Sequence, residues 1–95
     1  MILYLSLKEI WYRLIEAGIK IEEYREITEY WTKRLVGKHY DFVEFTLGYP
    51  KSSDLSRRMR FKLNGIEVKS GNPDWGAEPG KIYYVLKIGE RVYSL

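Results

Sequence analysis

The stretch from Gly18 to Arg25 joins two different kinds of secondary structure. Before Gly18, apolar residues recur every three or four positions, as in a helix that buries one face; after it, charged residues dominate. Glycine just past a helical pattern readily adopts the left-handed backbone that ends a helix. The residues that follow place an ammonium, two carboxylates, a phenol and a guanidinium close together. A strand that only filled a core would be more apolar, so we interpret this stretch as the functional edge of a small domain.

The chain is long enough for one domain with a modest core. We expect a single domain over residues 1–95. The composition, 45% hydrophobic and 31% charged, is typical of a folded soluble protein, and the aromatic share of 16% is high. A net charge of +3 is compatible with a polyanionic partner but does not require one.

Residue counts exclude several kinds of site. The absence of cysteine excludes disulfides and thiolate metal ligands, and the single histidine would need carboxylates to hold a metal. We therefore expect no metal and no cofactor. The N-terminal apolar run turns polar far short of the roughly 20 residues that a membrane span needs. The expectation is a cytoplasmic protein without a membrane partner.

The first helix is expected directly after a short strand at residues 2–5. Ser6 and Glu9 have the spacing of a capping box, in which each side chain bonds the other residue's backbone N–H. Apolar residues then recur at helical spacing, and we predict that they belong to the core. For Trp11 the alternative is a base-stacking role. The predicted stripe consists of Leu7, Ile10, Trp11, Leu14 and Ile15.

The charged strand at residues 19–25 raises a geometric question. In a regular strand Lys20 and Tyr24 lie on one face, whereas Glu23 and Arg25 lie on the other. Lys20 and Glu23 therefore converge only if Lys20 still belongs to the turn, or if a bulge re-aims one of them. The alternative is a solvated strand on which Glu23 and Arg25 pair at the surface, a contact worth about 0–1 kcal/mol.

A second, short helix should follow. Thr28 is a good N-cap, and the pattern predicts a helix from there to a stop at Gly37. Trp31 is expected on its buried side. Tyr30 and Arg34 should lie beside the charged strand, with Tyr30 at the wall of a site.

The later strands include one with alternating basic residues. A strand at residues 40–47 precedes a run at 57–63, in which Arg58, Arg60 and Lys62 would project together. Neighbouring cations repel unless something negative lies across them, and phosphate is the natural candidate. The alternative is that they protect an exposed sheet edge from pairing.

The C-terminal third combines a shaped loop with a central strand. Asn64 and Gly65 predict a hairpin or a bulged continuation of the basic strand. Residues 70–81 are rich in turn formers around Trp75, which would plug the end of a barrel or contact a ligand. The nearly continuous apolar run at 82–88 predicts a central strand, with a tight turn or a bulge after it.

These elements predict an α+β, mainly β domain. About five or six short strands and two short helices near the N-terminus indicate a small curved or closed sheet, with helices against its openings. Gly18, Lys20, Glu23 and Arg25 also have the form G-x-K-x-x-E-x-R, which resembles the signature of the ASCH family, small relatives of the PUA fold. The segments at 5–11, 27–31 and 71–76 look like parts of a compact ASCH-type protein as well.

The resemblance implies a PUA-like β-barrel that binds RNA or a modified nucleoside in a cleft between the first helices and the barrel. Lys20, Glu23 and Arg25 would carry over as the family's lysine, acid and arginine. Some small relatives resembling this family remove an acetyl group from a modified cytidine, using a lysine, a threonine three residues later and a distant glutamate. Here Glu23 occupies the threonine's place, which removes that hydroxyl.

The leading functional hypothesis is an RNA- or nucleotide-binding module, and two others stay open. A hydrolase acting on RNA or a modified nucleoside would use Glu23 as general base and Lys20 to stabilise developing negative charge. A protein-interaction domain with an incidental charged cleft is the third. The predicted ligand-binding residues are Lys20, Glu23, Tyr24, Arg25, Tyr30, Arg34, Arg58, Arg60 and Trp75.

Overall fold

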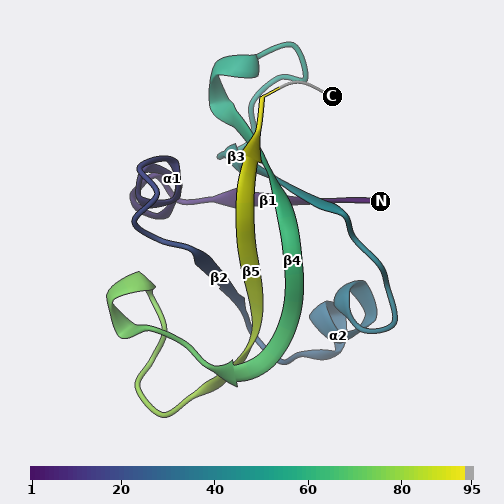
Figure 1. Cartoon of the computed structure of the whole chain (residues 1–95), viewed down its shortest axis with the longest axis vertical. Coiled ribbons are helices and arrows are strands. Elements are labelled where there is room, and N and C mark those ends of the chain that lie inside the picture. Colours follow the sequence, from purple (N-terminus) through teal and green to yellow (C-terminus); the bar gives the residue numbers. More distant parts are fainter. Residues whose placement is uncertain (94–95) are drawn as a thin grey trace.

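A computed structural model describes residues 1–93 as a curled, half-barrel sheet of five strands with two α-helices (Figure 1). The predicted α+β, mainly β class is confirmed. Single turns of 3-10 helix span Leu55–Arg57 and Pro73–Trp75. In chain order the main elements are β1 (Ile2–Leu7), α1 (Glu9–Glu16), β2 (Glu22–Arg25), α2 (Glu29–Leu35), β3 (Phe42–Leu47), β4 (Arg58–Ser70) and β5 (Ile82–Val92).

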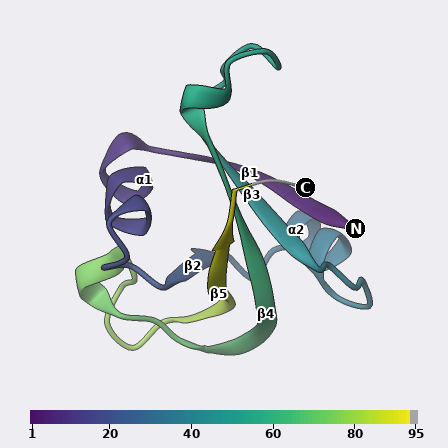
Figure 2. The ribbon, with the colours of Figure 1, turned by 45° about the horizontal axis from the view of Figure 1, so that its top comes forward.

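The sheet order is β1-β3-β4-β5-β2. β1 pairs with β3 in parallel, and the other neighbours are antiparallel. β4 and β5 are the longest strands, and both views place α1 and α2 on opposite sides of them (Figures 1 and 2). The register of this pair shifts near Asn64 and Gly89, so the chain continues through both predicted turn signals with bulges rather than a hairpin.

Alternation along the strands separates a buried face from an outer face. Odd-numbered residues of β1, β3 and the start of β4 are buried, including Leu5, Phe45 and Phe61, except for the half-buried Leu47 at the end of β3. Tyr12, Ile15 and Leu35 from the two helices complete this core together with Tyr84 and Leu86 of β5. Even-numbered residues on β1, β3 and the start of β4 therefore face outward.

The start of α1 differs from the prediction. β1 continues to Leu7 because it stays in register with β3, so Ser6 belongs to the strand and forms no capping box. Lys8 is the N-cap and supplies no side-chain bond. The helix is consequently rotated relative to the expected stripe: Tyr12 is buried, whereas Ile10 is 59% exposed.

The ends of the helices follow the sequence signals closely. Gly18 has φ +76°, and the backbone N–H groups of Ile19 and Lys20 both donate to Leu14 O, which closes the last turn of α1. Thr28 Oγ1 accepts from the backbone N–H of Trp31, so the predicted N-cap of α2 is confirmed. β2, however, begins only at Glu22, after the solvent-exposed Ile19 and Ile21.

Replacing Gly18 tests the left-handed end of α1. Space for a Cβ exists at this position, so Gly18→Ala adds only the backbone cost, roughly 1–2 kcal/mol. We expect that loss in the free energy of unfolding, measured in urea. Gly18→Asn should lose less, because asparagine tolerates this conformation. Equal stability of Gly18→Ala and wild type would contradict the account.

Candidate functional site

Lys20 is buried, with its side chain only 1% exposed. Its Nζ lies 2.9 Å from Glu23 Oε1 and donates to the carbonyl oxygen of Trp75 at 2.7 Å. The rings of Trp11 and Tyr24 lie 4.8 and 4.9 Å from the ammonium. Burial lowers the pKa of Lys20, and the Glu23 carboxylate opposes that shift. The ammonium thus has a carboxylate, a carbonyl and two aromatic faces in place of water.

Lys20 and Glu23 meet because β2 starts late. Lys20 lies in the connection after α1 rather than in a regular strand, so strand alternation does not separate it from Glu23. This is one of the two conditions under which the sequence allowed them to converge. The glycine that ends α1 is therefore what directs the lysine inward.

Glu23 joins Lys20 to Arg25. Its second carboxylate oxygen, Oε2, accepts from Arg25 Nη2 at 2.7 Å, and its side chain is 8% exposed. The same Nη2 donates to the carbonyl oxygen of Ser6 in β1 at 3.3 Å. The interpretation of Glu23 and Arg25 as a surface pair is therefore wrong: they form a buried chain of charges with Lys20.

A cavity of about 240 Å³ lies beside Lys20, and we call it the Lys20 cavity. Tyr24 spans its rim: its hydroxyl donates to Glu22 and accepts from the backbone N–H of Asn72. Burial raises the pKa of Tyr24 to about 12. Trp75 contacts Lys20 through its backbone carbonyl and is not among the residues of the hydrophobic core. The lining consists of Trp11, Lys20, Glu23, Tyr24, Glu26, Trp75, Gly76, Glu78 and Tyr83.

A second cavity, of about 400 Å³, lies between α2 and β1, and we call it the Arg25 cavity. Arg34 donates to the hydroxyl of Tyr30 and to the carbonyl of Tyr4. The guanidinium groups of Arg25 and Arg34 lie 4.9 and 5.2 Å from the ring of Trp31. The lining consists of Tyr4, Leu5, Ser6, Arg25, Tyr30, Trp31, Arg34, Thr46 and Tyr49.

The Arg25 cavity has unused hydrogen-bonding and charge capacity. None of its lining residues carries a carboxylate, whereas three of those around the Lys20 cavity do. Arg34 has no carboxylate partner within residues 1–93. Arg25 Nε is buried and has no acceptor among the same residues. An anionic ligand fits this cavity better than the other.

Arg58 and Arg60 project together as predicted, but the negative group between them belongs to the protein. Glu44 Oε1 accepts from Arg60 at 2.6 Å, and Glu44 Oε2 lies 3.2 Å from Arg58 Nη1. Lys62 instead lies 3.8 Å from Glu90. β4 lies between β3 and β5 in the sheet, and Arg60 has a paired residue on each of them, so edge protection does not explain these charges.

The register brings these arginines near the Arg25 cavity. Two rows of outward side chains cross β1, β3 and β4, and neighbouring strands lie about 5 Å apart. The rows start at Tyr4 and Ser6, whose carbonyls accept from Arg34 and Arg25. The row that starts at Tyr4 ends at Arg60, and the row that starts at Ser6 ends at Arg58. The first row is Tyr4, Glu44 and Arg60; the second is Ser6, Thr46 and Arg58.

Sequence reasoning placed several important residues wrongly or left them out. Trp11 was predicted to be core packing, yet it is half-buried over the Lys20 ammonium. Trp31 packs against the core as predicted, but it also contacts both guanidiniums of the Arg25 cavity. Tyr4 was missed, although its even position in an otherwise apolar strand marks it as outward-facing.

Comparisons with protein-family models, curated proteins and solved structures found no match for this chain. Within residues 1–93, no cluster of three His, Asp or Glu side chains is arranged to hold a metal ion. Among the same residues, neither helix has the length and apolar character needed to cross a membrane.

Removing the Glu23 charge should strongly destabilise the fold. In Glu23→Gln, the buried Lys20 and the half-buried Arg25 lose their counter-ion, and breaking a buried pair costs about 3–5 kcal/mol. We expect a loss of that size in chemical unfolding, partly restored when Lys20→Met is added. The control is Glu29→Gln, which breaks an exposed pair and should cost less than about 1 kcal/mol.

Lys20 should also give the protein a distinctive alkaline response. Its folded pKa lies below its ordinary value of 10.5, so between these values the unfolded chain binds more protons. Stability then rises with pH through that window, and below it the buried charge carries its full cost. The free energy of unfolding of wild type should therefore gain on that of Lys20→Met as the pH approaches 10.5. The exposed change Lys33→Met should leave the pH slope of wild type intact.

Proposed function

We propose that this chain is a small RNA- or nucleotide-binding module of the ASCH type, working in the cytoplasm. The observation that carries the proposal is the Arg25 cavity, where two guanidinium groups and four aromatic side chains meet without a lining carboxylate. It lies between α2 and the sheet, where the resemblance to the ASCH family leads us to expect the cleft.

The chemistry of this cavity suits a nucleotide. Arg34 keeps an uncompensated charge, and guanidinium groups bind phosphate through paired N–H donors. Tyr30 is 60% exposed and Tyr49 is 95% exposed, so their rings are accessible for base stacking. Stacking on an aromatic side chain is worth about 1–3 kcal/mol per base. Together these groups favour unpaired RNA, whose bases are free to stack.

Arg58 and Arg60 would extend the contact along the RNA backbone. The two guanidinium groups share the single carboxylate of Glu44, so the three residues together keep a net charge of +1. Arg58 and Arg60 lie at the far end of the outward rows that start beside the Arg25 cavity. Such contacts position a nucleic acid without reading its sequence.

Lys20 and Glu23 act in this proposal as positioning residues. Glu23 fixes the Arg25 guanidinium, and Lys20 fixes Glu23. Tyr24 and Trp75 contact Lys20, and within residues 1–93 neither makes a hydrogen bond to a residue that lines the Arg25 cavity. In this proposal the G-x-K-x-x-E-x-R pattern contributes to binding by holding the Arg25 guanidinium at the cavity.

Binding of a labelled mixed-sequence RNA tests the proposal. We expect the affinity to fall as salt rises, and to fall about tenfold or more in Tyr30→Ala/Arg34→Ala, which removes a stacking face and a phosphate contact. Lys33→Ala is the control, because it removes an exposed charge from the same helix outside the cavity. Absence of binding at low salt, or equal losses in the control, would overturn the proposal.

Hydrolysis of a modified nucleoside is the second candidate, and the Lys20 cavity favours it. A buried lysine with a lowered pKa beside a carboxylate and aromatic walls is typical of a reactive site. Both Glu23 oxygens already accept from cations, so Glu23 would need to release one to activate water.

A screen of modified nucleosides for turnover tests this second candidate. Turnover that is abolished in Lys20→Met while RNA binding is retained would support it. Turnover that survives the loss of the Lys20 ammonium would exclude the proposed site.

A further inference from the structure

The second half of β4 is an open sheet edge. β4 runs to Ser70, but β3 pairs with it only from Arg58 to Lys62. Beyond Leu63, whose N–H donates to Asp41 O, β4 is paired only with β5. Residues 64–70 therefore form an edge whose outer side has no neighbouring strand in the described part of the chain.

The register shows which backbone groups point outward along this edge. Ile88 N–H donates to Ile21 O, so Ile88 directs its backbone groups away from β4. By alternation Leu86 and Tyr84 do the same, and β4 pairs them with Ile66 and Val68. Ile66 and Val68 must then direct their own N–H and C=O groups away from β5, toward the open side. Within residues 1–93, these groups have no hydrogen-bond partner outside the β4–β5 ladder.

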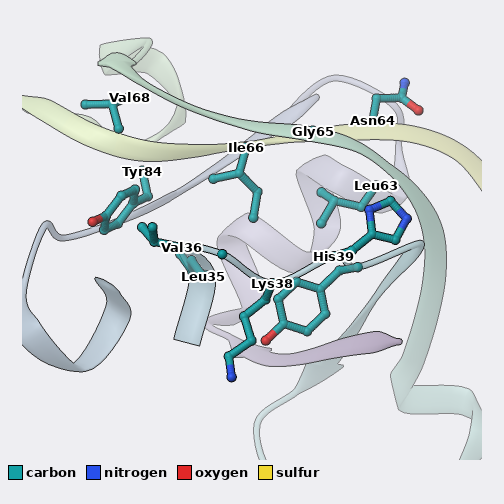
Figure 3. A pocket seen from close by; sticks show the side chains of 12 residues that line it. Leu35, Val36, Lys38, His39, Leu63, Asn64, Gly65, Ile66, Val68 and Tyr84 are labelled. Atoms are coloured by element: carbon teal, nitrogen blue, oxygen red, sulfur yellow. The ribbon is translucent and has the colours of Figure 1, made fainter. Parts of the chain in front are cut away.

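A cavity of about 470 Å³ with both apolar and polar lining residues lies against this edge (Figure 3). In Figure 3, Ile66 points from β4 into the space, and the chain at Leu35 and Val36 lies on the opposite side. Val36 is 58% and Val68 is 60% exposed, so apolar surface remains uncovered. Lys38 is the charged side chain among the lining residues, and none of the lining residues carries a carboxylate. His39 Nε2 lies 2.9 Å from Oδ1 of Asp41, which is not part of the lining.

We propose that this edge binds an extended, apolar and acidic peptide segment of a partner protein by strand addition. The outward N–H and C=O groups of Ile66 and Val68 supply main-chain hydrogen bonds, and the cavity takes alternate apolar side chains of the peptide. Lys38 favours a carboxylate on the segment. This site is separate from the proposed RNA site, since the two cavities share no lining residue.

The chemistry of the edge distinguishes a peptide from RNA. The cavity has no arginine, and Tyr84 is 6% exposed with its hydroxyl bonded to Thr32. It therefore offers neither a bidentate phosphate donor nor an open stacking face from that ring. A seven-residue extended peptide matches the edge in length as well, because residues 64–70 span about 23 Å at roughly 3.3 Å per residue.

The test uses the full chain and a labelled heptapeptide, Thr-Val-Thr-Val-Thr-Glu-Thr, in which the two valines and the glutamate share one face and can point together toward the cavity and Lys38. We expect saturable binding in fluorescence polarisation and shifts of the Ile66 and Val68 amide signals in NMR spectra. Two further peptides carry N-methyl groups at alternate backbone nitrogens, one at the odd-numbered and the other at the even-numbered residues. Only one of these sets of N–H groups faces β4, so only one of the two peptides should bind at least tenfold more weakly. Equal binding of all three peptides would overturn strand addition.

A charge change gives a matched pair of variants. Val36→Glu adds a carboxylate to the cavity wall at an exposed position and should weaken peptide binding at least tenfold. Ile19→Glu adds the same charge at a similarly exposed site elsewhere and should leave it unchanged. Absence of binding up to millimolar peptide would overturn the proposal. So would dimerisation through residues 64–70, or displacement of the peptide by RNA.

Discussion

The ion pairs of the Glu23 carboxylate with Lys20 and Arg25 are the interactions on which both the Lys20 cavity and the Arg25 cavity depend. One oxygen of the carboxylate faces a buried ammonium and the other holds a guanidinium, so a single negative charge compensates two positive ones. A buried ion pair contributes little net stability relative to apolar residues, but it is intolerant of losing one partner. Its value here is geometric. It fixes a cation at the boundary between β2 and β1, where a flexible side chain would otherwise sample many positions.

The same residues show why charge counting along the sequence is a poor guide to ligand sites. The basic run of β4 looked like a phosphate site, yet Glu44 on the neighbouring strand takes up part of its charge. Arg34, on the short helix α2, has no carboxylate partner among residues 1–93. Pairing across strands decides which cations remain available, and single-sequence patterns do not contain that information.

Sequence signals that act over a few residues correctly predicted the helix ends and the alternation of the strands. Glycine at positive φ, the Thr28 cap and strand alternation each act within a few residues, and each was read correctly. The failures share a long-range cause. Ser6 stayed in β1 because β3 lies beside it, and the rotated face of α1 followed from that change. Lys20 and Glu23 were predicted as a pair only conditionally, because their meeting depends on where β2 begins. The position of Trp11 above the ammonium required the fold itself.

The sheet does not close into a complete barrel, and the way its ends meet has a mechanical consequence. β1 and β2 are the two ends of the strand order, and Arg25 crosses from one to the other through Ser6 O, while Arg34 ties α2 to Tyr4 O. Side chains alone therefore join this seam, whereas a ladder of backbone bonds joins every other junction. Within residues 1–93, widening the seam between β1 and β2 breaks the Arg25–Ser6 contact and no backbone hydrogen bond between these two strands. Opening the seam would therefore widen the Arg25 cavity while leaving every strand ladder of the sheet intact.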